Sequence, residues 1–248
     1  MNNFIYLHTY GHELVPDFWI SKVPGKINRL YYIHSGSGGF IHNGKYTEFK
    51  KGWIYYFPFP TDVDFVWNND NKILHTYANF ELIPPLISRE VLEFNPERDA
   101  KAMAALSVFI EGSKQASENI RDTFNANKEF FSLYKNSISY LIMTVARANR
   151  LNPLDDEIII NSLKFIHDNL SSEISVNSMA ASAYMSTDAF IRRFKRVVNT
   201  TPYAYIRMLR LQTALTLREN GFSLDKIAEK TGYANTSSLL HALNKNHL

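Results

Sequence analysis

The chain contains no cysteine among its 248 residues, which excludes disulfide bonds, cysteine-ligated zinc and a cysteine nucleophile. Its first ten residues have neither a basic start nor an apolar stretch, so they do not resemble a secretion signal. The longest apolar runs, such as 140–145, are far shorter than the roughly 20 residues that a membrane-spanning helix needs. These absences predict a cytoplasmic protein that does not use a membrane.

Motifs of enzyme chemistry are missing as well. The sequence has no Gly-x-Ser-x-Gly nucleophile turn, no phosphate-binding loop and no dinucleotide-binding glycine pattern. Its eight histidines include no His-x-His pair, and no acid lies between His8 and His12. We therefore expect no enzyme activity, no metal site and no cofactor, and a metal-dependent enzyme is the least favoured alternative.

Residues 1–94 are rich in aromatic and β-branched residues, which turn signals divide into short runs. The pair Asn43-Gly44 lies between two such runs and predicts a tight hairpin, because both residues tolerate positive φ. Pro58 and Pro60 interrupt regular strand pairing. Short strands at this spacing predict a small sandwich or barrel.

Residues 97–149 have helical character instead. Apolar residues recur at three- and four-residue steps from Phe130 to Val145, which is too regular for a flexible linker. From Ile158 onward the whole chain reads as helical. The sequence therefore predicts an α+β protein whose C-terminal part is all-α.

Two segments of that part, at about 176–197 and about 223–246, have the features of a helix-turn-helix. Such a unit needs a small residue in its first helix, so that the second can cross closely, and a tight turn. In the first segment these are Ala180 or Ala181 and the turn Tyr184-Met185, and Ser186 fits the N-cap that follows. In the second they are Ala228 and the turn Thr231-Gly232-Tyr233.

The net charge of +3 is too small to indicate nucleic acid, but its distribution is informative. Between Ser186 and Arg218, Asp188 is the only acid. Basic residues on helices are usually just solvated, yet these coincide with a predicted recognition helix, so we favour phosphate contact. The basic stripe consists of Arg192, Arg193, Lys195, Arg196, Arg207, Arg210 and Arg218.

A specific set of motifs joins the two units through a linking helix, namely Ser186, Phe190, Arg193-Phe194-Lys195-Arg196, Thr201-Pro202-Tyr203-Ala204-Tyr205-Ile206, Arg210-Leu211, Ala214, Leu217, Ile227-Ala228 and Gly232-Tyr233. A less specific set follows in the N-terminal half: Arg29-Leu30-Tyr31-Tyr32-Ile33, Gly36-Ser37-Gly38-Gly39-Phe40, Asn43-Gly44-Lys45-Tyr46, Lys51-Gly52 and Pro58. With these motifs the chain resembles the AraC/XylS family of bacterial transcriptional regulators over almost its whole length.

The resemblance implies three parts: a cupin-like ligand-sensing small β-barrel at 1–94, a helical linker or dimerisation segment at 95–150, and an AraC-type DNA-binding domain at 155–248. In the family the middle helices commonly mediate dimerisation, so we favour dimer contact for the apolar stripe, although it could instead pack on its own strands. The implied partners are double-stranded DNA, a small-molecule effector, a second copy of the chain and, for an activator, RNA polymerase.

The resemblance also implies which residues touch DNA. Arg192 is the strongest candidate, because arginine bidentate to guanine is the commonest specific base contact. Ile191 could touch a thymine methyl group or simply pack. The candidate DNA-binding residues are Ser186, Thr187, Asp188, Ile191, Arg192, Lys195 and Arg196 in the first unit, and Thr236, Ser237, Leu240 and His241 in the second.

The N-terminal half offers aromatic side chains and scattered polar groups, which suit a sugar or another small polar ligand in a barrel mouth. Aromatic residues in strands are more often core, and only one of the neighbours Tyr55 and Tyr56 can face the inside of a barrel. The candidate ligand-binding residues are Arg29, Tyr31, His42, Tyr55, Asp62, Trp67 and His75.

The chain departs from the family pattern near its end. The second recognition helix has Leu239 and Leu243 where the family prefers aromatics, and Lys245 is its only basic residue. The sequence stops at Leu248, before the family's closing helix, so we expect Leu239, Leu240 and Leu243 to be less well buried. The alternative function is a small-molecule-binding protein with a truncated, non-functional DNA-binding half, which could act through mixed dimers.

Overall fold

The computed structural model describes residues 4–16, 22–23, 27–59, 61–83, 85–86, 88–118, 128–151, 155–219 and 221–244. The chain divides into two compact units, Met1–Pro153 and Leu154–Leu248. Each unit has a hydrophobic core of its own.

The described strands of the first unit pair antiparallel in two sheets. The larger sheet has the order β1-β8-β3-β6-β9 and the smaller one β2-β7-β4-β5. Their bounds are β1 Phe4–Leu14, β2 Lys22–Val23, β3 Asn28–Ser35, β4 Gly38–His42, β5 Lys45–Glu48, β6 Ile54–Phe57, β7 Val63–Trp67, β8 Leu74–Ile83 and β9 Leu92–Phe94. The predicted hairpin at Asn43-Gly44 is confirmed, with φ of 50° and 74° between β4 and β5.

The two sheets face one another across an aromatic core and share no strand in the described part of the chain. The closed barrel that we expected is therefore not what these residues form. The chain crosses from β3 to β4 at Gly36, whose φ is 91° and where a Cβ would collide with the Lys72 carbonyl oxygen. This corner carries the chain into the second sheet, so β3 and β4 do not pair.

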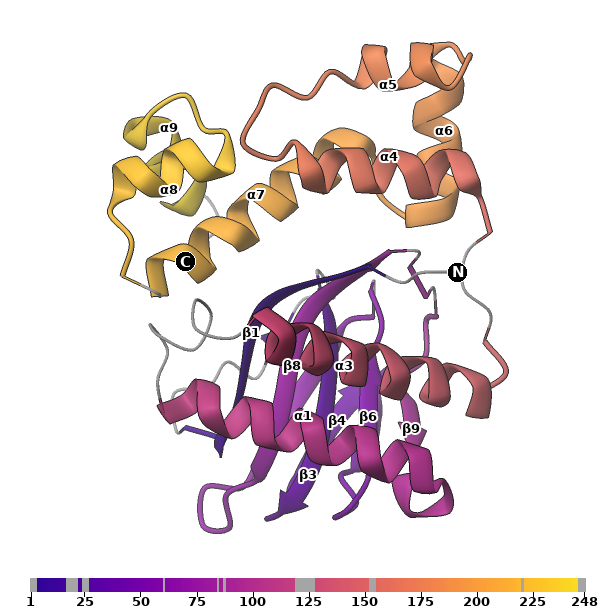
Figure 1. The fold of residues 1–248 in the computed structure, drawn as a ribbon, viewed down its shortest axis with the longest axis vertical. Helices are drawn as coiled ribbons and strands as arrows, with labels where there is room; N and C mark the ends of the chain where they lie inside the picture. The colour runs from indigo at the N-terminus through magenta and orange to yellow at the C-terminus, as the bar shows by residue number, and fades with distance from the viewer. Residues whose placement is uncertain are drawn as a thin grey trace. The chain divides into compact units, whose positions relative to one another are not determined.

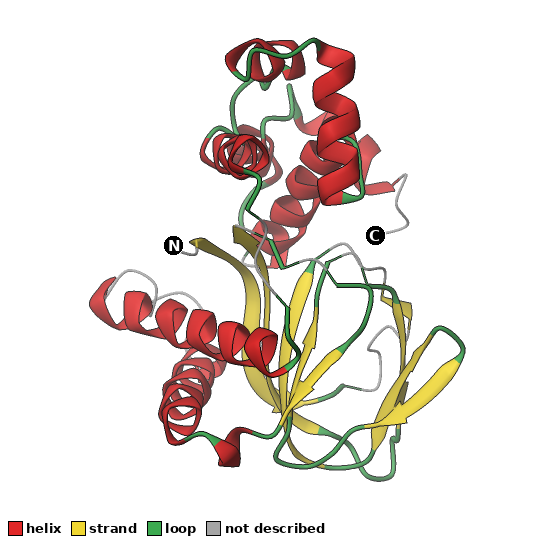
Figure 2. Ribbon diagram, turned by 90° about the vertical axis from the view of Figure 1, so that its right-hand side faces the viewer, coloured by secondary structure: helices red, strands yellow, loops and turns green. Residues whose placement is uncertain are grey.

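Two helices cover the other face of the larger sheet (Figure 2). They are α1, Ala100–Glu118, which follows the short 3-10 helix Pro96–Arg98, and α3, Lys128–Ala148. Where α1 and α3 meet, Tyr134 lies directly on Gly112 and its hydroxyl hydrogen-bonds Ser113 at 2.8 Å. Strand alternation thus gives the larger sheet two apolar faces: Tyr56 faces the helices and Tyr55 faces the smaller sheet.

The apolar stripe of α3 is buried within its own unit. Ile138, Leu141, Ile142 and Val145 all belong to the core between the helices and the sheet. A dimer contact through this stripe, which we had favoured, is therefore wrong, because these side chains are already covered. None of the described helices is long and apolar enough to cross a membrane.

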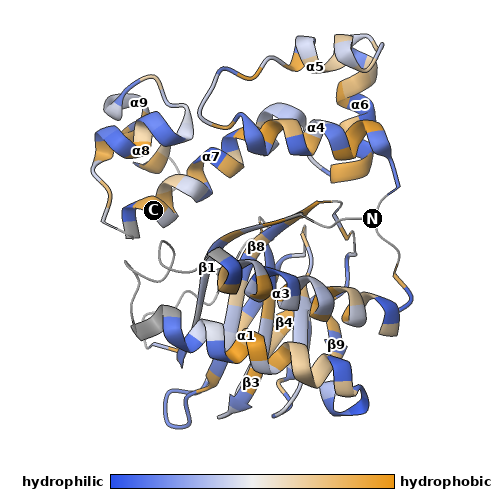
Figure 3. Cartoon of the chain, in the orientation of Figure 1, coloured by the Kyte–Doolittle hydropathy of each residue, from blue (hydrophilic) through white to orange (hydrophobic). Residues whose placement is uncertain are grey.

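The second unit consists of helices in its described residues (Figure 1). They are α4 Glu157–Asp168, α5 Val176–Ser182, α6 Thr187–Val198, α7 Pro202–Glu219, α8 Leu224–Thr231 and α9 Thr236–Asn244. In Figure 3, α6 and α8 each show both hydrophobic and hydrophilic colours, as expected of helices with one side in a core.

The local signals of the sequence explain where these helices begin and end. The Ser186 hydroxyl caps α6 by accepting from the Ala189 amide, and Ser223 caps α8 in the same way through Lys226. Left-handed residues end both helices: Asn199 has φ of 58° and Gly232 has φ of 70°. The predicted Ser186 cap and the predicted turn at Gly232 are thus confirmed.

Candidate nucleic-acid interface

Helix α6 is held to its unit by aromatic anchors. Phe190, Phe194 and Val198 are buried on its inner side. The Phe194 ring lies 6.0 Å from that of Phe190 and 5.8 Å from that of Tyr205 on α7. Phe190 and Phe194 thus pin this helix to the core of its unit.

The opposite side of α6 faces solvent. Asp188, Arg192, Lys195 and Arg196 are exposed, and Ile191 is half-buried. An exposed face with three cations next to a buried anchor suits a helix that enters a major groove. The candidates Asp188, Arg192, Lys195 and Arg196 therefore face solvent, whereas their contact with DNA stays a prediction.

A side-chain hydrogen bond joins the two helices of the first helix-turn-helix. The hydroxyl of Thr187, at the start of α6, donates to Oδ1 of Asn177, in the first turn of α5, at 3.1 Å. Ser186 and Asn177 are exposed beside it. The N-terminal ends of both helices therefore open on the same polar surface, next to the candidates Ser186 and Thr187.

Arg193 has a structural partner, although we had counted it in the basic stripe. Its Nε and Nη2 donate to the two carboxylate oxygens of Asp156 at 2.9 and 3.1 Å. Burial alone raises the pKa of Asp156, but hydrogen bonds from Arg193 and the Ile159 amide bring that pKa below its usual value. Because Asp156 also caps α4, this pair joins α6 to α4. No sequence signal revealed it, since the two residues lie 37 positions apart.

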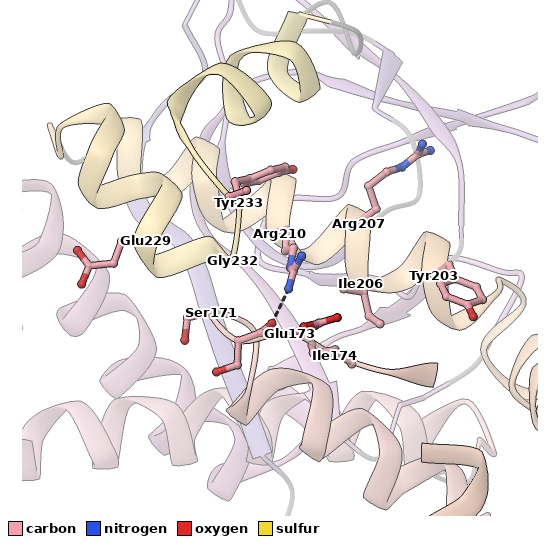
Figure 4. A pocket seen from close by; sticks show the side chains of 12 residues that line it. Ser171, Glu173, Ile174, Tyr203, Ile206, Arg207, Arg210, Glu229, Gly232 and Tyr233 are labelled. Carbon is pink, nitrogen blue, oxygen red and sulfur yellow. Dashed lines mark hydrogen bonds between the residues drawn. The ribbon is translucent and has the colours of Figure 1, made fainter. Parts of the chain in front are cut away.

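Arg210 likewise holds the unit together. Its guanidinium donates to the carbonyl oxygens of Leu170, at 3.2 Å, and Ser172, at 2.7 Å, in the loop after α4. Figure 4 shows Arg210 among the residues that line the neighbouring pocket. The same group packs on Gly232, where an added Cβ would come within 2.7 Å of Nη2. Arg210 thus ties the loop before the first helix-turn-helix to the turn of the second, beside a cavity of about 590 Å³.

The second recognition helix, α9, is better buried than we expected. Leu239 and Leu243 lie fully within the core that α7 and α8 also form, so the prediction of poor burial is wrong for both. Leu240 is 40% exposed, and Ser237 and His241 are exposed beside it, with Thr236 half-buried. Asn235 starts the helix by accepting from the Ser238 amide at 2.9 Å. Lys245 lies outside the described residues.

Three of the candidate ligand residues form part of the core between the sheets. Tyr31, Tyr55 and His75 are buried, and the Tyr31 ring lies 5.1 Å from that of His75. The Tyr55 hydroxyl accepts a hydrogen bond from the Lys50 amide at 2.7 Å. Their role in packing is therefore established, while ligand contact stays a prediction.

The other candidates lie near the two ends of the sheets. Arg29 is buried, and burial lowers its pKa, whereas Tyr31 and Asp62 favour its charged form. His42 lies at the same end, with Nδ1 2.9 Å from the Asp62 carbonyl oxygen. Trp67 lies at the other end of β7, and its ring stacks on that of Phe65 in the same strand, with the ring centroids 4.9 Å apart. The structure thus gathers Arg29, His42 and Asp62 but not Trp67.

A histidine cluster that the sequence did not indicate lies across β1, β3 and β8. His12 Nδ1 and His34 Nε2 are each 2.8 Å from the Thr76 hydroxyl. Burial, together with the smaller effects of nearby His12 and Lys114, lowers the pKa of His34 to about 4. Burial lowers the pKa of nearby His75 to about 3. Within the described ranges, no three His, Cys, Asp or Glu side chains are placed to hold a metal ion.

Comparisons with known proteins agree with the helix-turn-helix geometry. Residues 179–247 match the family described as a helix-turn-helix domain. An AraC-like transcription regulator of Streptomyces antibioticus is 32% identical over 87 residues, 35% of this chain and 29% of that protein. The transcriptional regulator AlkR of Acinetobacter baylyi is 30% identical over 86 residues, 34% of this chain and 28% of that protein. The matched region thus spans less than a third of either relative.

The fold of the whole chain also has a counterpart among solved structures. ToxT from Vibrio cholerae covers 98% of this chain, and 93% of ToxT is covered, with a TM-score of 0.57 and 13% identity. At that identity the likeness establishes a shared fold: a sheet-based N-terminal unit followed by a helical one. These features define a class of proteins in which a sheet domain is followed along the chain by two helix-turn-helix motifs. Residues 179–247 thus form a helix-turn-helix domain, and the C-terminal part of the chain is similar to AraC-like transcription regulators.

Proposed function

We propose that this protein is a ligand-responsive, sequence-specific DNA-binding transcription regulator. The observation that carries the proposal is α6, whose buried Phe190 and Phe194 leave Arg192, Lys195 and Arg196 exposed on one side. A rigid helix with a cationic outer face matches the chemistry of a major groove lined by phosphates.

Within this proposal the exposed residues have different tasks. Arg192 reads guanine through two hydrogen bonds, while Lys195 and Arg196 neutralise phosphates. Helix α9 offers Ser237, Leu240 and His241 and no described cation, so its contacts are weaker and more apolar. The first helix-turn-helix therefore supplies most of the affinity.

The effector site belongs, in our proposal, to the N-terminal unit as a cupin-like ligand domain. Solved ToxT structures include one bound to an unsaturated fatty acid and one bound to (E)-4-(8-methylnaphthalen-1-yl)but-3-enoic acid, both of which are carboxylic acids. Buried Arg29 suits such a ligand, because a guanidinium pairs with a carboxylate through two charge-assisted hydrogen bonds. We therefore favour a carboxylate-bearing effector over a sugar.

Regulation would follow from differential binding. An effector that prefers one arrangement of the chain shifts the population toward it, and so changes how the recognition helices are presented. A homodimer on a two-part operator and, for an activator, a contact with RNA polymerase complete the proposal.

The test is fluorescence anisotropy of the full chain with duplexes from upstream of its own coding region, and with scrambled duplexes of equal length. We expect tighter binding to one natural duplex, with affinity falling as salt rises, and a change of affinity on adding a long-chain carboxylic acid. The variant Arg29→Gln should keep DNA binding and lose the response to the acid. Equal, weak binding to natural and scrambled duplexes at low salt would contradict the proposal.

A further inference from the structure

The turn of the first helix-turn-helix contains a tyrosine in an unfavourable backbone conformation. Tyr184 has φ of 54°, in the left-handed region that costs side chains with a Cβ roughly 1–2 kcal/mol. Its side chain is nevertheless 99% exposed, so it gains nothing from packing. In the second helix-turn-helix the corresponding residue of the turn is Gly232, which also has a positive φ, of 70°.

The Tyr184 side chain does not hold the turn together either. Backbone hydrogen bonds close the turn, from the Tyr184 amide to the Ala181 carbonyl at 3.0 Å and from the Met185 amide to the Ala180 carbonyl at 2.9 Å. Glycine would make the same two bonds without the conformational cost. A large aromatic side chain at this position is therefore not explained by folding, and it indicates contact with another molecule.

The position of the turn indicates what that task is. Tyr184 lies two residues after Ser182, the last residue of α5, and two residues before Ser186, the cap of α6. In a helix-turn-helix on DNA, the start of the second helix enters the major groove and the first helix crosses the backbone. The turn between them therefore lies beside the phosphates at the groove edge, and tyrosine hydroxyls are among the groups that donate to phosphate oxygens.

We propose that Tyr184 is a DNA-backbone contact of the first helix-turn-helix, with its hydroxyl donating to a phosphate oxygen at the edge of the groove that α6 enters. This inference rests on the proposed function. It adds an uncharged phosphate anchor next to the cationic ones, and it explains why an exposed tyrosine occupies a place that suits glycine.

Two variants of the full chain test this inference. Tyr184→Phe removes only the hydroxyl, so we expect DNA affinity to fall about threefold to tenfold with the unfolding temperature unchanged. Tyr184→Gly should lose at least as much affinity while its unfolding temperature stays equal or rises, because the left-handed strain is relieved. The control is Tyr46→Phe, which removes the hydroxyl of another exposed tyrosine, on β5 of the N-terminal unit, and should bind DNA as the wild type does.

A salt titration of the Tyr184→Phe variant gives an independent readout. The slope of log affinity against log salt should equal that of the wild type, because a neutral hydroxyl releases no counterion. Wild-type affinity in both variants would overturn this inference alone, and so would a loss of affinity in Tyr184→Gly that is accompanied by a lower unfolding temperature. A wild type that binds no duplex would overturn the proposed function together with this inference.

Discussion

Replacing Phe194 with alanine should weaken the packing of α6, the first recognition helix, on the rest of the C-terminal unit. The side chain is fully buried, and its ring contacts those of Phe190 and Tyr205. Truncation of a fully buried phenylalanine costs about 3–5 kcal/mol, because apolar burial is lost and a cavity remains. A domain of this kind is stable by only about 5–15 kcal/mol, so the unit should stay folded but open far more often.

Hydrogen exchange measured by mass spectrometry on the full chain reads this effect locally. A cost of about 3–5 kcal/mol raises the population of the open form by roughly two to four powers of ten, so amides of α6 should exchange correspondingly faster. Amides of α3, in the other unit, should keep their wild-type rates. DNA affinity should fall in parallel, because a first helix-turn-helix that is open cannot present Arg192.

A matched control comes from Phe165 on α4, which is 44% exposed in the same unit. The Phe165 side chain buries less apolar surface than that of Phe194. The substitution Phe165→Ala should therefore have a far smaller effect on exchange in α6. Equal exchange in Phe194→Ala and wild type, or equal effects of the two substitutions, would refute the role of Phe194 as an anchor.

Three further predictions concern selectivity, pH and the second turn. Arg192→Ala should relax base preference at one operator position, whereas Lys195→Ala should weaken binding to all duplexes and flatten the salt slope, as anisotropy with single-base operator variants will show. Stability of the N-terminal unit should fall as pH drops below about 6.5, because His34 and His75 bind protons in the unfolded state but, with folded pKa values of about 4 and 3, not yet in the folded one; a flat unfolding temperature between pH 6.5 and 4.5 would speak against this. Gly232→Ala should destabilise the second unit by about 1–3 kcal/mol, since φ there is 70° and the added Cβ meets a carbonyl oxygen at 2.6 Å; urea unfolding that matches the wild type would rule out the strain.

Local features of the fold could be predicted from the sequence because they depend on neighbouring residues. The hairpin at Asn43-Gly44, the Ser186 cap and the turn at Gly232 each follow from the conformational preferences of one or two residues. The anchoring of α6 by Phe190 and Phe194 follows from helical periodicity in the same way.

Features that depend on distant parts of the chain could not be predicted. The pairing of Arg193 with Asp156 spans 37 residues, so a residue that looked like a phosphate contact is part of the framework. The apolar pattern of α3 predicts that one side of the helix is buried, but it does not predict whether a second copy of the chain or the larger sheet covers that side. The histidines around Thr76 come from three strands whose register no local signal determines.

The central claim is that the outer face of α6 reads DNA sequence. Selection of bound duplexes from a random library, followed by sequencing, tests it for the wild type and Arg192→Ala side by side. We expect one enriched motif for the wild type and loss of preference at a single guanine in the variant. A wild type that enriches no motif, or a variant that enriches the same motif unchanged, would contradict it.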